Sequence, residues 1–195
     1  MPAKVPAPRL NAIPEDKLTP RQRELREAIM SGPRKIPNIR GPFAVWLHAP
    51  EFGDHAQRLG AFVRYSTALP PRLSEFAILC TARLWRSQYE WFAHEPMAAR
   101  AGVSARTIAD LRAGRMPKAA AKDERAIYDF VTELYKTRRV SNRAYARLRT
   151  FLEESAIVEL VGILGYYVLV SMTLNVFRAP LPPGAKAPFA EPAKA

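Results

Sequence analysis

The sequence predicts an all-α protein with one folded domain. Three observations lead to this prediction: apolar residues recur at helical spacing, capping signals precede the apolar stretches, and Pro or Gly separates segments of helix length. No stretch alternates apolar and polar residues as a half-buried strand would, and no internal repeat stands out. At 195 residues the chain is long enough to bury a core without a metal or a disulfide.

Helix starts are marked along the chain by capping residues. The segment Thr19–Gln22 combines a T-x-x-Q capping box with Pro at the first helical position, so a helix begins there and ends before Gly32. Ser87, Ser104 and Ser141 are expected to cap later helices, and Gly102 and Gly114 to end two of them. Helices are expected over about residues 20–31, 43–49, 54–65, 72–86, 88–101, 105–113, 142–152 and 155–177, with another opening at Asp123.

Several of these helices have one apolar face, which predicts the side that enters the core. In the helix over 72–86 the residues expected to point inward are Leu73, Phe76, Ala77, Cys80 and Leu84. In the helix over 54–65 they are Leu59, Phe62 and Val63.

The last helix contains residues 160–177, a run of 18 residues without charge. That run meets the lower length limit for a membrane-spanning helix. Ser171, Thr173 and Asn175 lie inside it, and no basic cluster lies beside it. A helix that is apolar all round is otherwise a core or subunit-interface helix, and we expect that role here.

The ends of the chain differ in composition from the middle. Residues 1–18 are rich in Pro and Ala and are expected to form a flexible arm, and residues 180–195 an irregular tail, so the domain covers residues 19–179. No apolar stretch follows Lys4, so no secretory signal is expected. The single cysteine, Cys80, permits no intrachain disulfide. Both points favour a cytoplasmic location.

One motif in the middle of the chain suggests chemistry. Glu90 and His94 are four residues apart and share one helix face, and Glu75 lies one helix earlier. Together with Ser87 they read Glu75-x11-Ser87-x2-Glu90-x3-His94. The alkylhydroperoxidase D-like proteins carry Glu-x11-Cys-x2-Cys-x3-His, with which this spacing agrees. The chain more closely resembles the carboxymuconolactone decarboxylases of that superfamily, which also lack the dithiol and keep a Glu-x3-His.

The resemblance implies a fold and an assembly. It implies an alkylhydroperoxidase D-like helical bundle that forms a homo-oligomer, trimeric or hexameric, with a pocket near the subunit interface. It covers about two-thirds of the chain, chiefly residues 72–102 and 159–175. The missing cysteines argue against peroxide reduction, because dithiol chemistry needs a thiolate and a resolving thiol. Cys80 shares the apolar side of its helix, where a packing role is expected.

For activity, the resemblance implies a lyase that decarboxylates a small unsaturated organic acid or lactone. His94 suits proton transfer near neutral pH, and Glu90 is expected to orient it or raise its pKa. Glu75 is counted with them as a catalytic candidate. The residues expected to bind substrate or wall the pocket are Arg86, Ser87, Tyr89 and Trp91. No cofactor is expected, and no metal site, because His48 and His55 lack a ligand pattern.

Simpler interpretations of the same residues stay open. Ser87-x2-Glu90 is itself a capping box, so Glu90 has a structural alternative. Trp91 likewise has the alternative role of a core residue that packs and does not bind a ligand. For the function of the whole protein, one alternative to the decarboxylase is an alkylhydroperoxidase-like or peroxiredoxin-like member of the superfamily that lacks the redox dithiol.

A rival function comes from another class of protein. The stretch Ala98–Arg115 has the small residue, glycine and aliphatic spacing of a helix-turn-helix, and the second helix would carry Arg106, Arg112 and Arg115. The net charge of +12 favours anionic partners, which include nucleic acid, a membrane surface and a small carboxylate. Any two helices that meet at a tight turn need this pattern, so the small carboxylate or lactone is preferred as the partner over nucleic acid or membrane.

Overall fold

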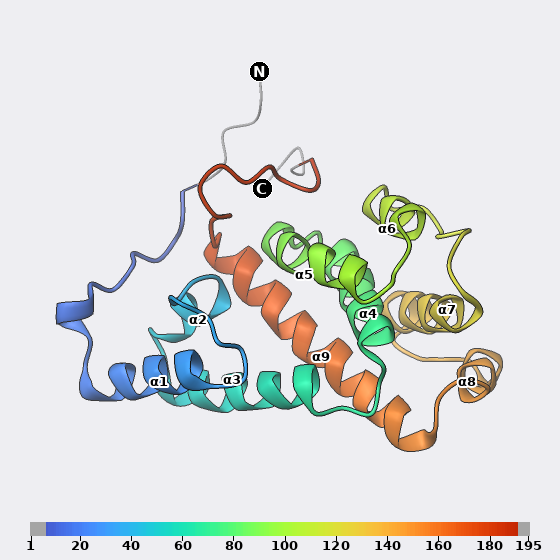
Figure 1. Ribbon diagram of the computed structural model, residues 1–195, viewed down its shortest axis with the longest axis horizontal. Coiled ribbons are helices and arrows are strands. Elements are labelled where there is room, and N and C mark those ends of the chain that lie inside the picture. Colours follow the sequence, from blue (N-terminus) through green and yellow to red (C-terminus); the bar gives the residue numbers. More distant parts are fainter. Residues whose placement is uncertain (1–6, 191–195) are drawn as a thin grey trace.

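A computed structural model describes residues 7–190, and this part of the chain is built from helices without strands (Figure 1). The all-α prediction is confirmed. A short 3-10 helix, η1 (Glu15–Lys17), precedes the first long helix. The α-helices are α1 (Pro20–Ser31), α2 (Pro42–Trp46), α3 (Pro50–Tyr65), α4 (Pro71–Leu84), α5 (Gln88–Arg100), α6 (Ala105–Arg112), α7 (Lys122–Thr137), α8 (Asn142–Arg149) and α9 (Glu154–Phe177).

Capping residues fix several of the helix starts where the sequence places them. The Thr19 hydroxyl accepts from the Gln22 amide, and the Gln22 side chain accepts from the Thr19 amide at 2.9 Å, so the capping box is complete. Ser104 and Ser141 each accept a backbone N–H three residues on, at 3.1 and 3.2 Å. Such caps satisfy backbone donors that a helix start otherwise leaves unpaired.

Two helices, α4 and α9, form the centre of the molecule. α9 crosses the fold from end to end, and α4 packs against α5, α7 and α9 (Figure 1). α2 and α3 cover another side of α9. By length and composition α9 could cross a membrane, but more than half of its most apolar window is buried inside the molecule. It is the core helix that its even distribution of apolar residues predicts.

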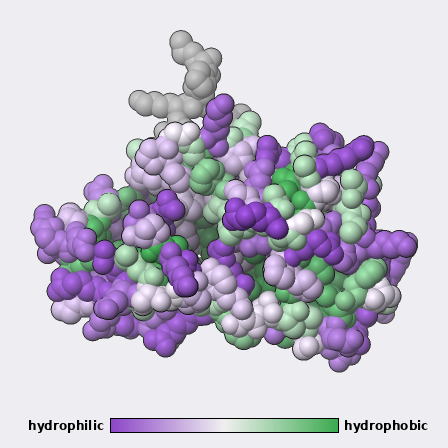
Figure 2. Space-filling model, viewed as in Figure 1, coloured by the Kyte–Doolittle hydropathy of each residue, from purple (hydrophilic) through white to green (hydrophobic). Residues whose placement is uncertain are grey.

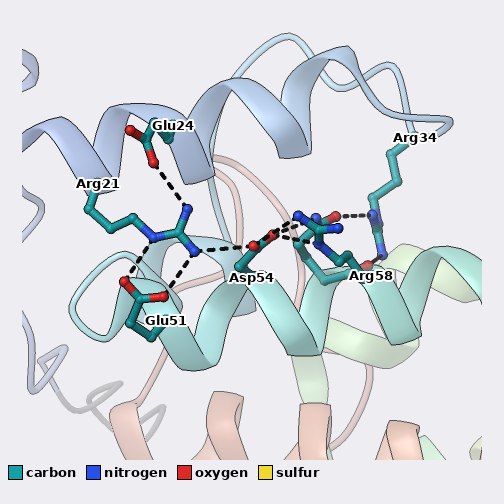
Figure 3. A network of polar contacts seen from close by, with 7 residues as sticks. Arg21, Glu24, Arg34, Glu51, Asp54 and Arg58 are labelled. Carbon is teal, nitrogen blue, oxygen red and sulfur yellow. Dashed lines mark hydrogen bonds and ion pairs between the residues drawn. The ribbon is translucent and has the colours of Figure 1, made fainter.

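α1 packs on Leu18 and Leu47 in a small apolar cluster, and an ionic network joins it to α3. Leu25 and Ile29 are fully buried in that cluster. Arg21 bonds Glu51 at 2.9 and 3.0 Å and Asp54 at 3.1 Å, and Glu24 accepts from it at 3.1 Å (Figure 3). The network therefore clamps the start of α3 to α1.

Three residues predicted to enter the core are wrongly assigned. Leu59 and Phe62 of α3 are about half exposed. α3 begins at Pro50, and apart from Val63 its buried residues are small or polar: Gly53, Asp54, Ala56, Gln57 and Gly60. Small side chains let α3 approach its neighbours closely, so the larger apolar residues point outward. Leu84 is also half exposed, because α4 ends at that residue.

Both termini contact the body of the protein as far as they are described. The Arg9 amide and guanidinium donate to the Phe177 and Val176 carbonyls at the end of α9, at 3.1 and 2.7 Å. Residues 180–190 are irregular, and Phe189 packs edge-on against Trp91. Residues 1–6 of the predicted arm and 191–195 of the predicted tail lie outside the described residues.

The visible surface is mostly hydrophilic, with hydrophobic residues showing between the charged side chains (Figure 2). Exposed apolar residues are frequent on two helices that pack together, α3 and α9.

Candidate active site

A cavity of about 90 Å³ lies where α3, α5 and α9 meet beside the start of α2. It is several times larger than the roughly 10–15 Å³ needed by one water molecule. Glu90 and His94 of α5 both line it, because residues one helical turn apart lie on one face. The same wall carries Tyr89, and α9 contributes Tyr166 and Tyr167 opposite. The cavity thus gathers ionisable and phenolic groups in an otherwise apolar lining.

His94 is held by a carboxylate from the neighbouring helix. Its Nδ1 lies 2.7 Å from Glu75 Oε2, and both residues are buried. The Tyr167 ring packs edge-on against the imidazole, with 4.9 Å between ring centroids. Burial lowers the pKa of His94, against the opposing effect of Glu75. The imidazole is therefore neutral near pH 7, and bonding at Nδ1 leaves Nε2 for a substrate.

Glu90 is a fully buried carboxyl. The Ser171 hydroxyl of α9 donates to its Oε2 at 2.8 Å, and its Oε1 has no hydrogen-bond partner among the described residues. Burial raises the pKa of Glu90 well above its ordinary value, and the Ser171 bond opposes that shift. The carboxyl accordingly keeps its proton to a higher pH than an ordinary glutamate does.

Two arginines bring positive charge to the cavity. Arg34 donates to the Gln57 carbonyl at 2.7 Å and to Gln57 Oε1 at 3.3 Å (Figure 3), and Arg64 donates to the sulfur of Met97. Neither guanidinium forms an ion pair with a carboxylate within residues 7–190. Uncompensated guanidinium groups in a low-dielectric wall attract anions, and carboxylates above all.

Gly60 makes room for the polar wall of the cavity. The Tyr166 hydroxyl lies where a Cβ at position 60 would be, and that Cβ would also lie 2.7 Å from an Arg34 nitrogen. Burial raises the pKa of Tyr166 to about 12, against the effect of Arg34. The phenol therefore stays protonated and, with Arg34, offers hydrogen-bond donors at one point of the wall.

The structure brings together four of the predicted site residues and separates the other three. Glu75, Tyr89, Glu90 and His94 form the site, as described above. Arg86, Ser87 and Trp91 lie outside the cavity lining.

The misplaced residues have physical reasons for their positions. Arg86 adopts a left-handed conformation (φ 50°) just after α4, and its guanidinium donates to the Ala190 carbonyl at 2.6 Å. Trp91 is fully buried on another side of α5, where its Nε1 donates to Glu95 at 2.7 Å. Ser87 is also fully buried, and its hydroxyl has no partner among the described residues.

Two interpretations of Glu90 are wrong. It does not complete a capping box, because the Ser87 side chain makes no capping bond and the Glu90 carboxyl bonds Ser171. It does not orient His94 either, since Glu75 occupies Nδ1. Both corrections come from tertiary packing: the α5 face that carries Glu90 is pressed against α9, so its carboxyl cannot turn back to the helix start.

Several cavity residues have no motif in the sequence that marks them. Arg34 comes from a loop and Arg64 from the end of α3, and neither belongs to a motif. Tyr167 and Ser171 had a usable signal, because they are polar residues one turn apart in the charge-free run of residues 160–177. Such groups usually find a partner inside the fold.

Cys80 lies outside this site. It is buried in the main core cluster, and burial together with the charge of Glu124 raises the pKa of its thiol. A protonated, inaccessible thiol is unreactive, which agrees with packing as its role.

The helix-turn-helix pattern corresponds to the junction of α5 and α6. Its small and aliphatic residues, Ala98, Val103, Ile108 and Leu111, belong to the main core. Of the arginines on the second helix and its end, Arg112 forms an ion pair with Glu95, and Arg115 pairs with Asp110 at 2.8 Å. The pattern is explained by packing, and much of the local positive charge is compensated.

Comparisons with known proteins identify the fold. No family model matches the sequence, and no curated protein matches it significantly. Among solved structures, an alkylhydroperoxidase AhpD core protein from Ralstonia eutropha, an uncharacterized peroxidase-related protein, is similar with a TM-score of 0.76 and 14% identity, over 91% of this chain and 94% of that one. A peroxidase-related protein from Silicibacter gives 0.72 and 11%, over 92% and 93%.

A third similar structure is a debrominase, Bmp8, with a TM-score of 0.67 and 12% identity over 88% of this chain and 91% of that one. A cysteine-to-alanine variant of it has been solved with 2,3,4-tribromopyrrole. The fold is therefore the alkylhydroperoxidase D-like helical fold, as the motif spacing implied.

Glu90 makes stability depend on pH in a way that Glu90→Gln removes. Below the ordinary glutamate pKa of 4.5, the folded and unfolded chains both hold the proton. Above it the unfolded chain releases the proton and the folded chain keeps it, so the parent loses stability as pH rises towards the raised pKa. The Glu90→Gln variant has no such proton to lose, so its unfolding free energy should exceed that of the parent by an amount that grows with pH. Between the ordinary and the raised pKa, this difference should grow by at most about 1.4 kcal/mol per pH unit. Urea denaturation from pH 4 to 9 measures it. Parallel curves for parent and variant would contradict the buried, neutral carboxyl, and Glu27→Gln at an exposed site is the control.

Gly60→Ala should disturb the polar wall of the cavity. The added methyl group overlaps the Tyr166 hydroxyl, so we expect a loss of about 1–3 kcal/mol in unfolding free energy. Tyr166→Phe should restore part of that loss in the double variant, because it removes the nearest atom. Chemical denaturation of the four proteins measures this coupling, and additive effects in the double variant would refute the contact.

Proposed function

We propose that this protein is an acid–base lyase of the carboxymuconolactone decarboxylase type, acting on a small unsaturated carboxylic acid or lactone. The observation that carries the proposal is the Glu90 carboxyl, fully buried, with one oxygen unpartnered among the described residues, in the cavity that His94 lines. A native protein rarely leaves a buried polar atom unpaired, and a ligand is one explanation for such an atom.

Substrate binding is assigned to the cations. A carboxylate that enters the cavity meets Arg34 and Arg64, and the tyrosines of α9 enclose its unsaturated body. Arg34 is held in advance by Gln57, whose amide donates to Asp54 at 3.2 Å. Asp54 also bonds Arg21 and Arg58. Through Asp54 and Gln57, the network in Figure 3 therefore holds Arg34 in position before substrate arrives. Preorganisation of this kind reduces the entropy lost on binding.

The chemical step separates carbon dioxide from the substrate. The bond between the carboxylate carbon and its neighbour breaks, and its electron pair passes into the conjugated system. Glu90 donates its proton to the carbon that receives this electron density, and solvent then reprotonates Glu90, whose raised pKa favours that return. Neutral His94, with Nδ1 bound to Glu75, accepts a hydrogen bond from a substrate hydroxyl or acid group at Nε2.

Dithiol peroxidase chemistry is not proposed, although some proteins of similar fold are described as peroxidase-related. The one cysteine is buried in the core. A fold hosts several chemistries, and the side chains in the cavity decide among them.

We propose also that the protein forms a homo-oligomer through α9 and α3. One side of α9 exposes Val158, Val161, Met172 and Val176 at helical spacing. On α3, Phe52, Leu59, Phe62 and Tyr65 are nearly half exposed. Monomeric soluble proteins seldom expose so many large apolar residues on adjacent helices, and a second copy of the chain would cover them.

The catalytic proposal is tested by screening small unsaturated carboxylic acids and lactones for thermal stabilisation and for release of carbon dioxide. With a substrate in hand, Glu90→Gln and His94→Asn should lower kcat by about 10²–10⁴, the usual contribution of a positioned proton-transfer group. Arg34→Gln should chiefly raise KM. His48→Asn, at an exposed histidine outside the cavity, should match the parent. The proposal fails if no acid or lactone stabilises the parent, or if His94→Asn turns over substrate at the parental rate.

The assembly is tested by sedimentation velocity. The parent should sediment as a trimer or a larger oligomer, and Val161→Glu with Met172→Glu should shift it to the monomer, since charges in an apolar interface are costly to bury. Tyr145→Glu on α8 is a control at another exposed apolar residue. A parent that sediments as a monomer at micromolar concentration would disprove the assembly.

A further inference from the structure

We propose that Arg83, Arg86 and Arg112 form a second anion site, which takes a phosphomonoester with a flat organic group. The site is a cavity of about 440 Å³ between the ends of α4 and α6, and residues 188–190 of the C-terminal segment form its third wall. Its lining has no residue in common with the candidate active site. The segment that supplies this wall runs over the outside of the helices near α5 (Figure 1).

Positive charge in this cavity is largely uncompensated. Arg112 pairs with Glu95, whereas Arg83 and Arg86 form no ion pair with any carboxylate in the described part of the chain. Arg83 donates its Nε to the Arg112 carbonyl at 2.9 Å, and Arg86 donates one Nη to the Ala190 carbonyl at 2.6 Å. A guanidinium has five N–H donors, so most of those on the two arginines remain for a ligand.

The Arg83 side chain is held in place from three directions. The Arg112 carbonyl binds its Nε, and its guanidinium lies 5.1 Å from the centre of the Phe189 ring. Gly114, in a left-handed conformation with φ 71°, provides the third contact, because a Cβ there would lie 2.5 Å from an Arg83 nitrogen. An ordered guanidinium loses little entropy on binding, which distinguishes this cation from a mobile surface arginine.

The remaining walls indicate the shape of the ligand. Ala109 and Ala113 are small, and the Phe189 ring is aromatic, so the cavity has space and an apolar surface beside the cations. Guanidinium groups bind phosphate oxygens in bidentate geometry, and a planar group can stack on an aromatic ring. A nucleoside monophosphate has both parts.

The segment that borders this open cavity is attached by contacts that can exchange. The side-chain amide of Gln88 donates its Nε2 to the Phe189 backbone carbonyl at 2.8 Å, and its Oε1 accepts from the Phe189 backbone N–H at 3.0 Å. A phosphate oxygen would replace the Ala190 carbonyl on Arg86 and gain a charge-assisted bond in its place. The Phe189 ring meanwhile remains anchored against Trp91, 5.1 Å away between centroids.

The test is isothermal titration calorimetry of the full chain with adenosine monophosphate and with inorganic phosphate at low salt. We expect adenosine monophosphate to bind one site per chain, with affinity that falls as salt is added. Arg83→Gln with Arg86→Gln should weaken binding at least tenfold, and Arg86→Gln alone, at an exposed side chain, should weaken it severalfold if the double variant does not fold. Phe189→Ala should lower the affinity for adenosine monophosphate more than the affinity for inorganic phosphate.

Arg106→Gln is the charge-matched control, because Arg106 is exposed on α6 outside the cavity lining. It should bind like the parent. Three results would overturn the proposal: no binding by the parent, equal loss in Arg106→Gln and the double variant, or binding of duplex DNA without binding of adenosine monophosphate. None of these measurements depends on the activity of His94 or Glu90, so the two sites are judged separately.

Discussion

The burial of the Glu90 carboxyl is the constraint on which the arrangement of the site depends. An ionised carboxylate without a countercharge is too costly to keep in an apolar interior, so the group stays protonated and bonds the Ser171 hydroxyl. For this bond to form, α5 and α9 must pack closely enough to exclude water from Glu90 Oε2. The α4 helix then supplies the carboxylate that His94 needs, at 2.7 Å. Two glutamates in one small region thus have opposite environments: one lies in apolar surroundings, and the other binds an imidazole.

The fold was predictable from local signals because most helices carry their own. The Thr19 capping box and the serine caps at 104 and 141 act within one turn and depend little on tertiary structure. The failures arose where tertiary packing overrode a local pattern. Ser87 has the capping sequence but no capping bond, and α3 packs through Gly53 and Gly60 while Phe62 points outward. A sequence pattern records which residues are apolar, but it does not record how closely two helices approach.

The candidate site was predictable to the extent that one helix determines it. Glu90 and His94 share a face by helical geometry, and both line the cavity. The partner of His94, by contrast, lies 19 residues away on another helix, and only the motif spacing suggested it. Arg34 gave no signal, since its position depends on Gln57 and on the α1–α3 ionic network. Arg86 was misplaced because a left-handed residue after a helix turns the side chain in a direction that helical periodicity does not describe.

The α5 helix lines the first cavity and holds the segment that borders the second. Glu90 and His94 face α9 and α4, whereas Gln88 and Trp91 hold the C-terminal segment on another side of the same helix. Glu90 and Trp91 are adjacent in sequence and both are fully buried, so α5 cannot rotate to improve one set of contacts without breaking the other. Because a packed interior resists such displacement, the contacts of the C-terminal segment help to fix the rotational position of the helix that carries the proton donor.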